Sequence, residues 1–423
     1  MLTIEASGAT KAGRVRRIWN RKVRQKRPPK SLNVPKIVGF VHKITQRYCD
    51  IGLLIPVLGL VIFGVLMIYS ASNYNAQIYY NDPFYYTIKQ LIGLVLGIVG
   101  LGVMYFVNYR WLQRLAYPIF GVAVVLLVAV FIPGIGISKL GATRWIGVGS
   151  FSLQPSEVAK FALVIFAARV FAGKYQANND EVNRVSQQRL SVPKWWQTLA
   201  VLMAGGIICG LIILEPNMSI TMTVGIIMFV LLFLCGVRLK TLGLILLPAV
   251  AAVGVMLIAA PYRLKRLSAF VDPWANPKGE GFQLIESLYA IANGGFWGVG
   301  YGNSVQKNMF LPFSESDFIF AIIAEEFGFV GCLVLFMAFA WIIYRIFKIG
   351  CNSTDFFGRY LCYGIATVIM VQTSLNFAVA TGCVPPTGLP LPFISFGGTS
   401  LLVFMMAIGV VLNVDKQNKK MIL

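Results

Sequence analysis

Carboxylates dominate the chemistry available to this chain. Seven of its 16 acidic residues fall between Asp272 and Glu326, and its only histidine, His42, lies in a basic N-terminal segment. A reaction that needs a proton acceptor near the acidic stretch must therefore use a carboxylate. Asp272 is the candidate general base, because it follows a basic trio and precedes Pro273 in an extended segment. The alternative is a turn-forming aspartate before a proline.

Arg144 and Lys160 could together bind a phosphate group. Arg144 and Trp145 follow a glycine-rich loop, and Lys160 lies near the start of an apolar run. The alternative is a tryptophan at the membrane surface beside an arginine that reaches towards water. Glu157 precedes Lys160 by three residues, a spacing at which helical side chains pair, so Glu157 is its predicted partner.

Glu215-Pro216-Asn217 interrupts two apolar runs with only a few residues between them. This pattern indicates a tight turn in which a carboxylate is tolerated if it faces water. A structural salt bridge from Glu215 to Arg144 or Lys160 is the alternative.

Asp317, Glu325 and Glu326 begin or enter the next apolar run. Ser314-x-x-Asp317 is a capping-box pattern, which places Asp317 in the first helical turn. Glu325 and Glu326 lie deeper, and contact with lipid would cost about 2.5 kcal/mol or more. We therefore expect them to pair with a buried lysine or arginine.

A segment rich in proline and glycine, residues 385–400, separates the last two apolar runs. Prolines remove backbone donors and glycines permit close backbone approach. At membrane depth such irregular backbone is tolerated only when it is buried in protein or lines a cavity.

The chain as a whole reads as a membrane protein. Apolar residues make up 57% of it and the mean hydropathy is +0.73. Ten runs are long enough to cross a hydrocarbon core of roughly 30 Å. They are 51–72, 85–107, 115–133, 155–173, 197–214, 217–236, 241–261, 316–344, 358–381 and 396–414.

The net charge of +21 is concentrated in the N-terminal segment and in short loops between apolar runs, which argues against nucleic-acid binding. With both termini cytoplasmic, most Lys and Arg residues fall on the inner side, as the positive-inside rule requires. The basic N-terminal tail also suits the anionic lipids of the inner leaflet.

These observations predict an all-α polytopic membrane protein with ten transmembrane helices. Residues 1–48 are predicted to form a basic cytoplasmic tail, 49–415 the membrane domain and 416–423 a cytoplasmic C-terminal tail. A large extracytoplasmic loop, 262–315, lies between helices seven and eight. Within it, residues 286–293 predict a short amphipathic helix that stops at Gly294-Gly295.

Three blocks of sequence resemble the SEDS family (shape, elongation, division, sporulation) of bacterial peptidoglycan polymerases, over nearly all of 45–415. They are Arg144-Trp145 with Gln154-Pro155-Ser156-Glu157-x-x-Lys160; Asp317-Phe318-Ile319-Phe320-Ala321 with Glu325-Glu326-x-Gly328; and Gly388-Leu389-Pro390-Leu391-Pro392-Phe393-Ile394-Ser395 with Gly397-Gly398. Other segments, such as Leu214-Glu215-Pro216, resemble the division and sporulation branch (FtsW, SpoVE) more than the elongation branch (RodA).

The resemblance implies that lipid II is polymerised outside the membrane, with release of undecaprenyl diphosphate. The family carries an essential acid directly before the second proline of the 272–277 segment, where this chain has Asn276. An amide cannot act as a base. Asp272 therefore takes the role, with Glu280 in reserve, or the protein is weakly active. One base suffices for an inverting displacement, unlike a two-carboxylate glycosidase.

Further residues follow from the same resemblance as substrate contacts. Arg144, Lys160, Arg263 and Lys307 would stabilise charge on the departing diphosphate, and a divalent cation, Mg²⁺ or Mn²⁺, could share that work. The remaining predicted substrate-binding residues are Trp145, Gln283, Ser395, Gly397 and Gly398.

The expected setting is the cytoplasmic membrane of a bacterium, at the division septum. The expected partners are a class B penicillin-binding transpeptidase, other division proteins, lipid II and membrane lipids. Two other functions stay open from the sequence. One is a transporter of lipid-linked precursor, and the other is a catalytically weak scaffold for a transpeptidase.

Overall fold

The computed structural model describes residues 49–139, 142–148, 151–173, 193–258, 267–279 and 281–422, all within one compact unit, Tyr48–Leu423. The predicted N-terminal tail, 1–48, lies outside the described residues, as do Arg263 and Glu280. The described part is mostly helical, and each predicted apolar run contains one helix.

The helices are α3 Ile51–Tyr80, α4 Tyr85–Phe106, α5 Arg110–Arg114, α6 Ala116–Ala129, α7 Pro155–Ala172, α9 Trp195–Leu214, α10 Met218–Leu234, α11 Leu239–Ile258, α13 Phe282–Gly294, α14 Ile319–Cys351, α15 Phe356–Ala380 and α16 Gly398–Ile422. A 3₁₀ helix, η1, spans Pro273–Ala275. Within the described residues, six helices are long and apolar enough to cross a membrane, namely α3, α4, α9, α14, α15 and α16.

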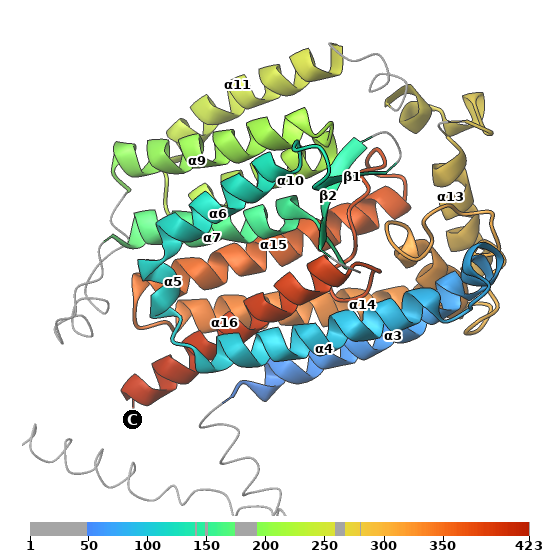
Figure 1. Ribbon diagram of the computed structural model, residues 1–423, viewed down its shortest axis with the longest axis horizontal. Coiled ribbons are helices and arrows are strands. Elements are labelled where there is room, and N and C mark those ends of the chain that lie inside the picture. The colour runs from blue at the N-terminus through green and yellow to red at the C-terminus, as the bar shows by residue number, and fades with distance from the viewer. Residues whose placement is uncertain are drawn as a thin grey trace, which may run out of the picture. The chain divides into compact units, whose positions relative to one another are not determined.

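Helix α15 occupies the centre of the bundle, packed against α14, α7 and α10 (Figure 1). Helix α16 lies along α4, and α3 joins α4 to α14. Small residues permit the close approach of α4 and α16: a Cβ on Gly93 would lie 3.2 Å from the Cα of Gly398.

A small antiparallel sheet corrects the all-α expectation. Strands β1 (Gly136–Lys139), β2 (Ala142–Val148) and β3 (Phe151–Leu153) are hydrogen-bonded in that order. Ile137 pairs with Trp145, and Ile146 with Leu153. The β-branched and aromatic residues of this segment favour strands. The sheet places Arg144 at the same end of the bundle as α13 (Figure 1), which we call the loop end.

Two helix boundaries differ from the prediction. Helix α14 begins at Ile319, so Asp317 precedes the helix. The Ser314 hydroxyl donates to the carbonyl oxygen of Ala71. The capping-box interpretation is therefore wrong. Helix α16 runs to Ile422 rather than ending before 416. The Lys419 ammonium lies 2.6 Å from the Asp415 carboxylate, an i,i+4 pair that favours continued helix.

Helix α14 is broken at Gly328, which has φ 62°. A loop that follows α13 supplies the hydrogen bonds that the helix loses there. Val299 N donates to Glu325 O, Gly300 N to Glu326 O, Phe329 N to Gly295 O and Val330 N to Phe296 O, at 3.0 to 3.2 Å. Helix α13 begins at Phe282, four residues before the predicted start, and ends at Gly294. Gly295 then has a positive φ of 52° but a ψ of −139°, so the predicted left-handed stop is not formed. Loop and helix thus complete each other's backbone bonding.

Candidate functional site

The proline- and glycine-rich loop between α15 and α16 is the element on which the loop end is assembled. Its apolar residues Leu391, Phe393 and Ile394 are buried. The Ser395 hydroxyl donates to the Ser316 carbonyl at 2.6 Å and accepts from the amide of Leu391 at 2.7 Å. Irregular backbone is therefore accommodated here because protein surrounds it.

Glycines in this loop contact α4. The amide of Gly397 donates to the Gln90 Oε1 atom at 3.3 Å, and Gly398 lies against Gly93. At the other end of the loop, Gly388 has φ 65° and lies against the Asp317 carboxylate. The predicted substrate contacts of Ser395, Gly397 and Gly398 stay predictions; their observed contacts lie within the protein.

Lys160 and Glu157 form a buried ion pair beneath this loop. The ammonium lies 2.7 Å from Glu157 Oε1 and 2.5 Å from the side-chain oxygen of Gln372 in α15. Gln372 in turn donates to the carbonyl of Pro390 at 2.8 Å, and Ser400 donates to Glu157 at 3.4 Å. The charge of Lys160 is therefore compensated inside the protein.

Arg144 joins β2 to the turn between α9 and α10. Its guanidinium donates to the carbonyl oxygens of Glu215, at 3.4 Å, and Pro216, at 2.5 Å. The Glu215 side chain is 1% exposed, and both its carboxylate oxygens lack a hydrogen-bond partner among the described residues. The expectation that Glu215 faces water is wrong, and Arg144 bonds the backbone of this turn rather than the carboxylate.

Asp317, in the segment before α14, lies in the field of the same arginine, and the neighbouring Glu315 carboxylate acts on Asp317. Burial, and to a lesser extent the Glu315 carboxylate, raise the pKa of Asp317 to about 6 against the opposing effect of Arg144. Burial also raises the pKa of Glu315, although the Ser314 hydroxyl and its own backbone oppose this shift. We call Arg144, Glu215, Glu315 and Asp317 the acid cluster.

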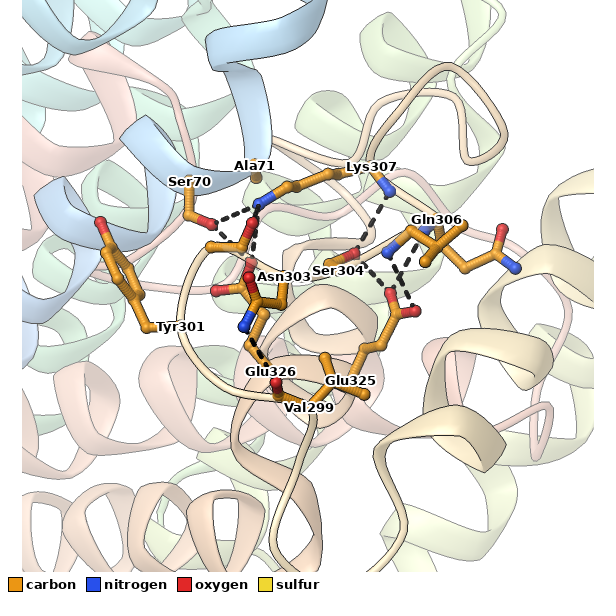
Figure 2. Close-up of polar contacts among 12 residues, drawn as sticks. Ser70, Ala71, Val299, Tyr301, Asn303, Ser304, Gln306, Lys307, Glu325 and Glu326 are labelled. Atoms are coloured by element: carbon orange, nitrogen blue, oxygen red, sulfur yellow. Dashed lines mark hydrogen bonds and ion pairs between the residues drawn. The ribbon is translucent and has the colours of Figure 1, made fainter.

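A second polar group holds the loop after α13 to the bundle (Figure 2). Lys307 donates to Glu326 and to Ser70, both at 3.0 Å, and Ser70 donates to Glu326 at 2.5 Å. Glu325 accepts from the Ser304 hydroxyl and, at 3.2 and 3.3 Å, from the amides of Val305 and Gln306. We call Ser70, Ser304, Lys307, Glu325 and Glu326 the loop anchor.

The predicted base lies apart from both groups in its bonding. Asp272 is exposed, caps η1 and accepts from the amide of Trp274 at 3.1 Å. Asn276 is also exposed and lies against Gly279. Gln283 is half-buried in the first turn of α13. Asp272 therefore forms a turn, as the alternative interpretation expected, and its carboxylate is also accessible to solvent.

The sequence alone did not identify Ser70, Ser304 or Glu315 of these groups, or Gln372 beside Lys160. Ser70 and Gln372 lie inside apolar helices, where a single polar residue carries no positional signal of its own. Glu315 adjoins Asp317 but was not singled out. Since buried polar side chains need partners, polar residues within apolar runs could have been matched to Lys160 and Lys307.

The described residues offer little to a divalent cation. No group of three or more His, Cys, Asp or Glu side chains within them lies close enough to hold a metal ion. The acid cluster also contains a guanidinium, which competes with a cation for the same carboxylates. No ligand set for Mg²⁺ or Mn²⁺ is therefore assigned here.

These features define a helical membrane protein in which most of the buried charges within the described residues gather at the loop end of the bundle. The family model for the FtsW/RodA/SpoVE cell cycle proteins matches residues 52–420. A relative from Trichlorobacter lovleyi, named probable peptidoglycan glycosyltransferase FtsW, is 38% identical over 86% of this chain and 93% of its own. Stage V sporulation protein E of Bacillus subtilis is 35% identical over 88% and 98%.

Solved structures agree with this assignment. A peptidoglycan synthase complex, described as coordinating polymerization and crosslinking, contains a chain with TM-score 0.69 and 28% identity, covering 88% of this chain and 98% of that one. The rod shape determining protein RodA of Thermus thermophilus has TM-score 0.61 and 25% identity, covering 88% and 97%. The chain belongs to the FtsW/RodA/SpoVE family.

Proposed function

We propose that this chain is a peptidoglycan glycosyltransferase that polymerises lipid II into glycan strands during division or sporulation. The reaction is an inverting displacement that releases undecaprenyl diphosphate at the outer face of the cytoplasmic membrane. Relatives that carry this activity in their names support the proposal along nearly their full length.

One structural observation carries it. The three sequence blocks that resemble the family are far apart in the chain, and their contacts bring them together at the loop end. Ser395 bonds the segment before α14, Thr399 donates to the carbonyl of Ser152 at 2.8 Å, and Ser400 bonds Glu157. A shared assembly of the blocks is expected if they serve one site.

Asp272 is the proposed general base. Its carboxylate is solvent-exposed at the start of η1, so an acceptor sugar hydroxyl could reach it. Asn276, in the position where the family has its acid, cannot take the proton. The proton would pass from the acceptor hydroxyl to Asp272 as the acceptor oxygen bonds the anomeric carbon and the bond from that carbon to the diphosphate breaks.

Arg144 is the proposed contact for the diphosphate. It is half-buried at the loop end, where a guanidinium can meet a developing negative charge. Lys160 and Lys307 are neutralised by Glu157 and Glu326, so their contribution would be to position the loop rather than to bind the anion. A divalent cation, if used, would take its ligands largely from the substrate.

The proposed setting follows from the helices and the charge bias of the loops. All ten predicted runs would cross the membrane, with both termini cytoplasmic and the loop end outside. A class B penicillin-binding transpeptidase is the proposed partner, supported by similarity to a chain of a synthase complex. The division septum is the proposed location.

A gel assay tests the function directly. The purified chain with its transpeptidase partner, in detergent or vesicles with labelled lipid II, should produce a ladder of glycan chains. Asp272→Asn should reduce the rate by about 10²–10⁴-fold. Production of no polymer by a folded wild-type complex would favour a scaffold, and translocation of labelled lipid II without polymer would favour a transporter.

A further inference from the structure

Glu215 is the most anomalous ionisable group in the described part of the molecule. It is 1% exposed, and neither carboxylate oxygen meets a hydrogen-bond partner there. An ionised carboxylate buried in this way would cost several kcal/mol, because burial weakens its solvation and no hydrogen bond among the described residues replaces it. The neutral acid avoids most of that cost.

The neighbours of Glu215 explain why the group is not simply paired. Arg144 lies beside this turn, but its guanidinium donates to the backbone carbonyls of Glu215 and Pro216. Burial raises the pKa of the Glu215 carboxyl to about 8, and the field of Arg144 lowers it only in part. The same guanidinium also lies in the field of Asp317.

Charge counting gives the consequence for a ligand. If Glu215, Glu315 and Asp317 were all ionised, the acid cluster would hold three negative charges against the one positive charge of Arg144. Such a cluster would repel an anion. Each proton retained by the cluster lowers that repulsion, and Glu215, whose pKa lies above that of Asp317, keeps its proton to a higher pH than Asp317 does.

We propose that Glu215 is held as the neutral acid in the resting protein, and that its proton controls the binding of a diphosphate-bearing lipid beside Arg144. This control rests on the glycosyltransferase function proposed above, whose substrate and leaving group carry a diphosphate. Binding of the anion retains the proton, and loss of the proton weakens binding, as reciprocal linkage requires.

The size of the effect follows from this linkage. A ligand that binds only the protonated form loses affinity by about tenfold between pH 7 and pH 9 when the controlling group titrates near 8. Glu215→Gln keeps the shape of the neutral acid and cannot ionise. The ratio of the two dissociation constants therefore isolates the titration of Glu215, because both chains meet the same charge on the ligand.

The test measures binding of farnesyl diphosphate to the purified full chain in detergent between pH 6 and pH 9.5, with farnesol as the uncharged control. The wild type should lose about tenfold in affinity relative to Glu215→Gln between pH 7 and pH 9. Glu286→Gln, which removes a partly exposed carboxyl on α13, is the matched control and should follow the wild type.

Asp317→Asn keeps the inference falsifiable if Glu215→Gln does not fold. Because the pKa of Asp317 is about 6, its removal should alter the curve below pH 7 and leave the fall between pH 7 and pH 9 intact. Loss of that fall in Asp317→Asn would assign it to the wrong carboxyl and overturn the role of Glu215.

Other outcomes are equally decisive. Parallel curves for the wild type and Glu215→Gln, or no diphosphate-dependent binding at any pH, would overturn the proton control. Polymerisation of lipid II with parallel curves would leave the glycosyltransferase function standing. Proton-linked binding without polymerisation would support the role of Glu215 and contradict the glycosyltransferase function. The failures of the two proposals are therefore distinguishable.

Discussion

The loop anchor and the acid cluster both involve loops at the loop end, but their buried carboxylates differ in how they are bonded. In the loop anchor, Lys307 meets Glu326 at 3.0 Å, and Glu325 accepts from a hydroxyl and two amides. In the acid cluster, Glu215 is as deeply buried but has no donor for either oxygen among the described residues. A paired charge fixes a loop, whereas an unpaired one leaves a place for a proton or a ligand.

The largest effect should come from breaking the pair in the loop anchor. Lys307→Met leaves Glu326 buried without a cation and should destabilise the protein by about 3–5 kcal/mol. Thermal unfolding of the purified chain in detergent would measure it. The double variant Lys307→Met, Glu326→Leu removes both charges and should recover most of the loss.

A double variant no more stable than Lys307→Met would contradict this account of the loop anchor. It would mean that the contacts of Lys307 with Ser70 and with the carbonyl of Gly302, at 2.6 Å, matter more than the ion pair.

An intermediate effect is expected at the helix break that carries the loop anchor. Gly328 has φ 62°, and a Cβ there would lie 2.4 Å from the amide nitrogen of Gly298. Gly328→Ala should therefore destabilise the protein by about 1–3 kcal/mol through backbone strain, before any clash is counted. Gly225→Ala in α10 is the matched control, because a Cβ there meets nothing within 4 Å.

Gly225→Ala should be neutral or stabilising, since alanine is the better helix former. Equal losses at Gly225 and Gly328 would show that any added methyl in this protein is harmful, and would remove the special role of the break.

The sequence predicted positions better than partners. Each of the ten predicted apolar runs contains a helix in the described residues, because an apolar segment satisfies its own backbone hydrogen bonds most simply as a helix. The spacing of Glu157 and Lys160 placed them on one helix face, where the structure pairs them. These are local features, and local periodicity is what a single sequence records.

The long-range partners could not be read in this way. Nothing in the sequence connects Lys307 with Ser70, which lies 237 residues away in α3, or Lys160 with Gln372. The break at Gly328 was also invisible, since a glycine within an apolar run carries no record of the loop inserted beside it. The burial of Glu215 depends on segments distant in the chain packing around its turn, among them β2 through Arg144, which only the assembled fold determines.

The smallest expected effect concerns the acid cluster: the pH dependence of the unfolding free energy that Glu215 causes. The pKa of Glu215 rises from an unfolded value of about 4.5 to about 8 on folding, so the folded state binds more protons between these values. Its contribution to stability is therefore fully present below pH 4.5 and is lost as pH rises towards 8.

The variant Glu215→Gln cannot titrate and so lacks this loss of stability. Relative to the wild type, the variant should gain about 1 kcal/mol in unfolding free energy between pH 6 and pH 7. Paired denaturation curves at the two pH values would measure the gain, because the titration of every other group cancels in the difference. A constant difference would mean that Glu215 does not titrate in this range, and that a donor reaches its carboxylate in the folded protein.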